Sequence, residues 1–251
     1  MSKNLLSLIH SDLKAVMKRD PAARHYLEII FTYSGFHATF IHRICNLLWR
    51  LKLKFIARTL SNISRILTSI EIHPAAKIDE GFFIDHGAGL VIGETTIIGK
   101  NVTIYQQTTL GGLSPSVDSD SQRNIKRHPT IRDNVIVGSG AQILGPVVIG
   151  KNSRIGANAV VLKDVPENIT YVGVPARKIE SRNLDESFNP YGISKGVIDD
   201  PNKKSIHALF KEIHTLNQKI NDLKKQIDQR IKIPNEIQIK QESKGKSERQ
   251  K

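Results

Sequence analysis

Cysteine is almost absent from this chain, since Cys45 is the single thiol among 251 residues. One cysteine excludes an internal disulfide framework and favours a reducing compartment, so we expect a cytoplasmic protein. Long apolar runs are also missing, and the N-terminal one is broken by His10 and Asp12. The sequence therefore predicts no signal peptide, no membrane-spanning helix and no membrane partner.

Aromatic residues are scarce too, at 6% of the chain, although the net charge of +13 is high. Between positions 201 and 251, thirteen Lys or Arg residues stand against six Asp or Glu, which gives 13 − 6 = +7 for this tail alone. A basic surface that stacks on bases needs aromatic side chains between its cations, and the tail lacks that interleaving. We interpret it as a solvated basic C-terminus and predict no nucleic-acid partner; binding to RNA or an acidic surface is the less favoured alternative.

Residues 1–70 show a helical pattern. Apolar residues recur at spacings of three and four from Leu5 onward, and Asp20-Pro21 punctuates the run as a turn into the next helix. No Gly or Pro interrupts the chain between Gly35 and Pro74, while charged residues recur too often for a membrane helix. The segment is predicted to be an N-terminal α-helical domain.

Residues 71–179 follow a different rule, because a branched apolar residue returns at every sixth position. Thirteen positions obey it, with one slip near Asp85 and one longer insertion: Ile72, Ile78, Ile84, Ile92, Ile98, Ile104, Leu110, Ile131, Val137, Ile143, Ile149, Ile155 and Val161. Hexapeptide spacing is typical of a parallel β-helix, in which each side of a triangular coil buries one such side chain. We predict a left-handed β-helix of roughly four or five coils, hence an α+β protein with helices at both ends.

The C-terminal part is predicted to be a linker over 180–204, a helix over 205–233 and a disordered basic tail over 234–251. The helix carries a heptad seam with Ile and Leu in alternate core positions: Ile206, Leu209, Ile213, Leu216, Ile220, Leu223 and Ile227. Ile at one position and Leu at the other favours two strands, whereas β-helix proteins usually assemble as trimers. Packing on its own subunit is the alternative for this helix.

Two breaks in the repeat carry the candidate chemistry. The first is the slip, where Asp85 and His86 precede three small residues; the second is the insertion from Gly111 to Thr130, which ends in Arg127-His128-Pro129. Each could be a plain corner loop, but two independent breaks that each hold a His beside a charged residue favour a functional site. HxxxH and CxxC spacings are absent, so no metal is predicted.

Several motifs together resemble the bacterial serine O-acetyltransferase family, in one of its shorter forms. They are RDPAARHYLEIIFTYSGFHA, EIHPAAKIDEGFFIDHGAGLVIGET, TLGG with KRHPTI, GSGAQILG and YVGVPAR, which together cover about residues 20–177. The resemblance implies transfer of acetyl from acetyl-CoA to the L-serine hydroxyl for cysteine biosynthesis, with acetyl-CoA as co-substrate and no permanently bound cofactor.

The resemblance also implies roles for the residues in these motifs. His86 matches the family's general base, which an imidazole suits because its pKa lies near neutrality. Glu71 occupies the position of a carboxylate that orients this base, where some members carry Asp, and His128 matches a second active-site histidine. For serine itself, Arg127 would hold the carboxylate while Asp20 and Asp85 would favour the ammonium. Asp20 before Pro21 is also an ordinary turn signal.

A pantetheine arm needs a groove where backbone can approach it closely. The corners that match the family's groove are Gly138, Ser139, Gly140, Gly156 and Ala157, and the candidates for the CoA phosphates are Lys163, Arg177 and Lys178. Small corners are also a plain need of any β-helix. No Cys or Ser stands beside His86, which favours direct attack in a ternary complex over an acetyl-enzyme.

The family implies a homo-oligomer, a trimer or a hexamer, with His86 and His128 of neighbouring subunits around one site. Members that bind O-acetylserine sulfhydrylase insert a C-terminal Ile, whereas this chain ends in Gln250-Lys251, so we expect that complex to be weak or absent. Two other hypotheses stay open at this point: a hexapeptide acetyltransferase with another hydroxyl or amine acceptor, and a non-enzymatic hexapeptide scaffold.

Overall fold

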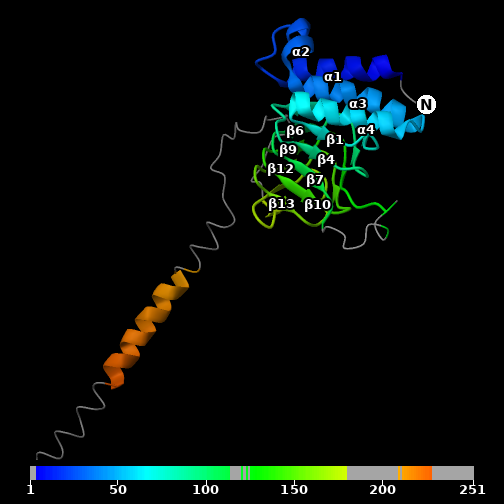
Figure 1. Cartoon of the computed structure of the whole chain (residues 1–251). Helices are drawn as coiled ribbons and strands as arrows, with labels where there is room; N and C mark the ends of the chain where they lie inside the picture. The colour runs from blue at the N-terminus through cyan, green and yellow to red at the C-terminus, as the bar shows by residue number, and fades with distance from the viewer. Residues whose placement is uncertain are drawn as a thin grey trace, which may run out of the picture. The chain divides into compact units, whose positions relative to one another are not determined.

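The chain was analysed as a computed structural model, which describes residues 4–113, 120, 123, 125–179, 209 and 211–227. It divides into two compact units, Met1–Ile198 and Asp199–Lys251, which are described separately. In the first unit, four helices gather at one end of a stack of short strands (Figure 1).

The helices are α1 (Leu5–Arg19), α2 (Tyr26–Thr32), α3 (Ser34–Arg50) and α4 (Lys54–Thr68). Asn4 caps α1 by accepting a hydrogen bond from the Leu6 amide at 3.4 Å, and α4 ends where Ser69 adopts a positive φ of 58°. A small buried cluster that includes Val16, Ile29 and Phe83 joins these helices to the strands. The helical part therefore packs onto the β-helix.

Fifteen short strands form the β-helix in the part of the chain that the structure describes. They are β1 (Glu71–Ile72), β2 (Lys77–Ile78), β3 (Phe83–Asp85), β4 (Val91–Ile92), β5 (Ile97–Ile98), β6 (Thr103–Tyr105), β7 (Thr109–Gly111), β8 (Thr130–Ile131), β9 (Ile136–Val137), β10 (Gln142–Leu144), β11 (Val148–Ile149), β12 (Arg154–Ile155), β13 (Val160–Val161), β14 (Thr170–Val172) and β15 (Arg177–Lys178). Every third strand stacks in parallel on the same face, which gives a prism with three sheets.

We call these faces sheet 1 (β1-β4-β7-β10-β13), sheet 2 (β2-β5-β8-β11) and sheet 3 (β3-β6-β9-β12-β14, closed by antiparallel β15). All thirteen hexapeptide positions point into the prism, and each is at most 9% exposed. Ile84 stacks on Ile104 and Ile104 on Val137, so the sixfold period of the sequence becomes columns of branched side chains. The prediction of N-terminal helices, a hexapeptide β-helix and a C-terminal helix is confirmed.

The slip in the repeat is a two-residue bulge. Asp85 pairs with Tyr105, and Ala88 already accepts the Gln107 amide of the next coil at 2.9 Å, so His86 and Gly87 have no counterpart there. Both have positive φ, 59° for His86 and 84° for Gly87. A Cβ on Gly87 would lie 2.5 Å from Ile70 and 2.7 Å from Ile84, so only glycine fits beside the histidine.

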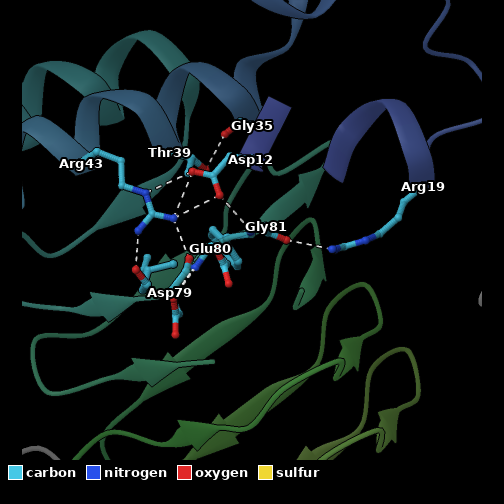
Figure 2. A network of polar contacts seen from close by, with 10 residues as sticks. Asp12, Arg19, Gly35, Thr39, Arg43, Asp79, Glu80 and Gly81 are labelled. Carbon is cyan, nitrogen blue, oxygen red and sulfur yellow. Dashed lines mark hydrogen bonds and ion pairs between the residues drawn. The ribbon is translucent and has the colours of Figure 1, made fainter. Parts of the chain in front are cut away.

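The first coil has no coil above it, and side chains of α1, α3 and α4 satisfy its free backbone groups. Ser61 donates to the Ile72 carbonyl at 2.8 Å, and Asn46 donates to Pro74 and Ala76. Arg43 donates to the carbonyls of Ile78 and Asp79, and Figure 2 shows it in the same network as Asp12, with Arg19 reaching Gly81 close by. Asp12 in turn accepts the Phe82 amide at 3.0 Å. These contacts anchor the helices to the β-helix.

The second unit contains a helix over residues 211–227. Its heptad positions Ile213, Leu216, Ile220, Leu223 and Ile227 are each 49–57% exposed. The predicted linker 180–204 and tail 234–251 lie outside the described residues, as do parts of the predicted helix 205–233. Within the described ranges, no helix is both long and apolar enough to cross a membrane.

Candidate active site

Most of the predicted site residues lie at two different edges of the prism, while Asp20 follows α1, Glu71 lies in β1, and Arg177 and Lys178 form β15. The "His86 edge" consists of the corners that lead from sheet 3 to sheet 1: residues 86–90, 106–108, 138–141 and 156–159. The "His128 edge" consists of the corners that lead from sheet 1 to sheet 2: residues 93–96, the described part of 112–129, 145–147 and 162–164.

His86 projects from its bulge with 75% of its side chain exposed. Its Nε2 lies 3.8 Å from Oδ1 of Asp85, and its carbonyl accepts a hydrogen bond from Ser34 at the start of α3, at 3.2 Å. A positive φ at a non-glycine residue costs about 1–2 kcal/mol, and such strain is found preferentially at functional sites. The bulge holds an accessible imidazole in a fixed loop beside an acid.

Asp20 lies in the same neighbourhood, where α1 ends. Its Oδ1 accepts the Ala22 amide and its Oδ2 accepts the Tyr33 hydroxyl, both at 2.8 Å. Burial raises the pKa of Asp85, an effect that His86 opposes and the nearby Asp20 carboxylate reinforces. Burial and the Asp20 carboxylate raise the pKa of Tyr33 to about 12. The structure thus brings Asp20, Asp85 and His86 together, and Asp20 also makes the turn that its position before Pro21 indicated.

Glu71 lies in β1, the first strand of sheet 1, and its carboxylate is half exposed. The charged group nearest to it is Arg65 of α4, with the Nε and Oε2 atoms 4.0 Å apart. Among the described residues no hydrogen bond or ion pair joins Glu71 to His86, so their pairing stays a prediction.

The His128 edge holds the second group. Arg127 and Glu94 form an ion pair with Nη2 and Oε2 2.7 Å apart, and both side chains are about one-third exposed. His128 is buried and its ring lies directly over Gly93, where a Cβ would overlap it. Burial, followed by the Arg127 and Lys126 cations, lowers the pKa of His128 to about 4, so its imidazole is neutral at neutral pH.

Thr95 and Lys126 hold this group in place. The Thr95 hydroxyl oxygen lies 3.0 Å from the amide nitrogens of both Arg127 and His128 and 2.9 Å from Nδ1 of His128. The Lys126 ammonium donates to the carbonyls of Thr95 at 2.8 Å, Pro129 at 3.0 Å and His128. The corner 93–96 and the end of the insertion are therefore fastened together.

The predicted CoA-binding glycines lie on the His86 edge, one and two coils beyond Gln106 and Gln107. Their small size also has a structural cause, since a Cβ on Gly138 would lie 2.7 Å from the Ala157 nitrogen and one on Gly156 would lie 2.6 Å from Val172. Ser139 and Ala157 stand at the same corners. Of the predicted phosphate ligands, Lys163 lies on the His128 edge, while Arg177 and Lys178 form exposed β15.

Sequence reasoning did not single out Glu94, Thr95, Lys126 or Tyr33. The first two stand in the corner IGET and Lys126 directly precedes Arg127, so proximity to the recognised motifs was the available signal. Within the described residues, no group of three or more His, Cys, Asp or Glu side chains could hold a metal ion.

Comparison with known proteins identifies the family. Residues 1–40 match the family described as serine acetyltransferase, N-terminal, and residues 128–163 match bacterial transferase hexapeptide (six repeats). The serine acetyltransferase of Bacillus subtilis strain 168 is 42% identical over 225 residues, which cover 89% of this chain and 98% of that protein. That of Bacillus pumilus is 41% identical over 224 residues, 88% of this chain and 98% of the relative. The chain belongs to the serine acetyltransferase family.

Solved serine acetyltransferase structures agree with this assignment. The enzyme of Neisseria gonorrhoeae in complex with serine matches with a TM-score of 0.64 at 40% identity, over 69% of this chain and 68% of that one. The enzyme of Brucella abortus strain S19 in complex with coenzyme A matches with a TM-score of 0.65 at 40% identity, over 71% and 68%. As a serine acetyltransferase, the chain is an acyltransferase with acetyl-CoA as its co-substrate.

Proposed function

We propose that this serine acetyltransferase acts by direct transfer in a ternary complex, with His86 as the general base. The imidazole takes the proton from the L-serine hydroxyl as that oxygen attacks the thioester carbonyl of acetyl-CoA. The tetrahedral intermediate then collapses, the C–S bond breaks, and the imidazolium returns the proton to the leaving CoA thiolate. The products are O-acetylserine and CoA.

The observation that carries this proposal is the bulge at His86 and Gly87. It adds two residues with positive φ to an otherwise regular corner and leaves the imidazole three-quarters exposed at the edge that also bears the glycine corners. A thioester at the near end of a pantetheine arm along this edge would meet His86. Asp85, 3.8 Å from the ring, is placed to stabilise the imidazolium that forms.

Charge complementarity supports serine as the acceptor. Asp20 and Asp85 lie beside His86 and suit the substrate ammonium, and Arg127 offers a guanidinium for the carboxylate, at present 2.7 Å from Glu94. Identity of 41–50% to proteins named serine acetyltransferase favours this acceptor over a sugar or another amine, and favours an enzyme over a scaffold. In this proposal Glu71 turns from Arg65 to the His86 ring when substrate is bound.

Because the two groups of site residues lie at different edges, we propose that one complete site is built from two copies of the chain. The His86 edge of one copy would face the His128 edge of the next, and three such contacts close a trimer. The cations Lys163, Arg177 and Lys178 would then flank the CoA phosphates. A trimer and a hexamer made of two trimers both satisfy this geometry, and the cytoplasm stays the expected location.

The test combines single variants with a mixture. CoA release from acetyl-CoA is measured with L-serine, and with sugars and amines as alternative acceptors, for the wild type, His86→Ala and a control, His10→Ala, in an exposed position of α1. We expect His86→Ala to lower kcat by about 10²–10⁴-fold and the control to leave it unchanged.

Mixing decides whether sites are shared. Unfolding and refolding His86→Ala together with His128→Ala should restore about a quarter of the wild-type sites, because random assembly of copies pairs the two intact edges with that frequency. Wild-type rates in His86→Ala would remove this residue as the base, and no recovery in the refolded mixture would show that each site lies within one copy.

A further inference from the structure

We propose that Thr95 is a positioning residue that fixes His128 as the tautomer with its proton on Nε2, so that His128 serves as a hydrogen-bond donor in the reaction. The proposal rests on the proposed function, because it assigns a task to His128 at the same site. It concerns a residue that touches no substrate and acts through the histidine.

Hydrogen-bond counting leads to this tautomer. A threonine hydroxyl can accept two hydrogen bonds and donate one. The amides of Arg127 and His128, each 3.0 Å away, occupy both acceptor positions of the Thr95 oxygen. Its one proton is therefore left for Nδ1 of His128 at 2.9 Å, which must accept it.

A second donor reaches the same ring nitrogen. The backbone amide of Thr95 donates to Nδ1 of His128 at 3.2 Å. A proton on Nδ1 would point at the N–H of the Thr95 amide. The Thr95 hydroxyl oxygen would then face three N–H donors, two from the backbone and one from the ring, and its own proton would have no acceptor. Nδ1 must therefore be unprotonated, and in a neutral imidazole the proton then lies on Nε2.

The environment keeps the ring neutral. His128 is 8% exposed, and the ammonium of Lys126 and the guanidinium of Arg127 stand on the same loop. Burial and these two cations lower the pKa of His128 to about 4, and Glu94 opposes them only in part. At neutral pH the His128 ring therefore carries one proton, and Thr95 determines which ring nitrogen holds it.

This arrangement divides the work between the two histidines. An imidazole with Nδ1 occupied and a proton on Nε2 cannot take a proton from serine without losing a contact to Thr95, so it cannot replace His86 as base. Its Nε2–H can donate to an oxygen, either that of the substrate carboxylate or the one that becomes negative in the tetrahedral intermediate. The same hydroxyl also holds the Arg127 amide, so one side chain aligns two groups of the site.

Thr96, the residue that follows Thr95, provides a matched control. Thr96 is 1% exposed, and its hydroxyl has no hydrogen-bond partner among the described residues. Three variants are compared with the wild type: Thr95→Val, which keeps the shape and loses the hydroxyl; Thr95→Ser, which keeps the hydroxyl; and Thr96→Val.

Two readouts are taken on the full-length enzyme. Long-range ¹H–¹⁵N spectra of ¹⁵N-histidine-labelled protein show which ring nitrogen carries the proton, with the His128 signals assigned by their loss in His128→Gln. Initial rates with serine and acetyl-CoA give kcat and KM, and circular dichroism checks that each variant is folded.

We expect the wild type, Thr95→Ser and Thr96→Val to show the Nε2–H tautomer. Thr95→Val should show a mixture of tautomers and a kcat about 10- to 100-fold lower, as for the loss of one or two hydrogen bonds in the transition state. Thr95→Ser should keep kcat within about threefold of wild type, less than the tenfold that one hydrogen bond is worth.

A proton on Nδ1 in the wild type overturns the proposal without any variant, as does an unchanged tautomer in folded Thr95→Val. Absence of serine-dependent turnover in the wild type would instead refute the proposed function, since the spectra need no substrate.

Discussion

Replacing Arg43 by Met removes a buried cation that fastens α1 and α3 to the first coil. The Arg43 and Asp12 side chains are 4% and 3% exposed, and their nitrogen and oxygen atoms make three contacts of 3.0–3.1 Å (Figure 2). The guanidinium also donates hydrogen bonds to the carbonyls of Ile78 and Asp79. Methionine fills similar space without charge, so Asp12 keeps only backbone amides as donors, those of Phe82 and Gly81.

The loss is expected to be about 3–5 kcal/mol of unfolding free energy, the usual cost of leaving one member of a buried ion pair alone. The second variant, Asp12→Leu, should cost a similar amount. The double variant Asp12→Leu/Arg43→Met should cost about 1–3 kcal/mol less than the sum, because the single variants each count the same broken contact.

The deficit of Arg43→Met should depend on pH. Burial already raises the pKa of Asp12 to about 6 from 3.8, and Arg43 opposes that rise. Without Arg43 the pKa rises further. A carboxyl whose pKa is raised on folding contributes stability below its unfolded pKa and loses it as pH climbs through the folded value, so the deficit is largest near pH 8 and shrinks toward pH 5.

Urea unfolding at fixed protein concentration measures these quantities, followed by the fluorescence of Trp49, which lies in α3. The surface pair of Lys100 and Glu80, 3.4 Å apart, supplies the control, since Lys100→Met should cost at most about 1 kcal/mol. A loss below about 1 kcal/mol for Arg43→Met, or a deficit that is equal at pH 8 and pH 5, would refute the reasoning.

Two further outcomes are expected. Burial lowers the pKa of His42 to about 3 and of His128 to about 4, so below the unfolded value near 6.5 these two histidines take up protons only in the unfolded chain. Asp12, whose pKa is raised to about 6, takes up its proton in the folded chain and offsets part of their effect. Unfolding free energy should then fall by about 1.4 kcal/mol per pH unit for each histidine between pH 6 and 5, and a flat urea-unfolding profile would contradict this. Gly93→Ala should push the His128 ring aside and lower kcat about tenfold or more while the protein stays folded, as for losing one hydrogen bond. Gly112→Ala should match wild-type kinetics, because among the described residues its Cβ would meet only the Arg127 carbonyl, at 3.7 Å.

The β-helix could be predicted from the sequence because its rule is local. A branched residue at every sixth position stays visible whatever the rest of the chain does, and the bulge appears as a change of spacing beside His86. The first-coil contacts could not be found in this way. In the sequence, Asp12 is only a polar residue within an apolar run, and Arg43 is only a charged residue within a helical pattern. Their pairing depends on how α1 crosses α3.

The same limit applies to the site. His86 and His128 are visible as histidines at breaks in the repeat, but Thr95 precedes His128 by 33 positions, and only coil stacking brings their side chains together. Glu71 illustrates the opposite case, since its motif indicates a partner for His86 while the structure gives it Arg65 as the nearest cation. The register in which one coil stacks on the next decides which side chains meet at a corner. That register depends on whole coils and cannot be deduced from a single motif.

The way the ends of the β-helix are covered limits aggregation between copies of this chain. A stack of coils could in principle grow without limit, because each exposed end is a template on which the strands of another molecule could pair. Here Ser61, Asn46 and Arg43 occupy the carbonyls of the first coil, and β15 closes sheet 3 in the antiparallel sense with two exposed cations. End-to-end pairing is thus opposed at the first coil and at the last strand of sheet 3, which favours the sides of the prism as the surfaces through which copies associate.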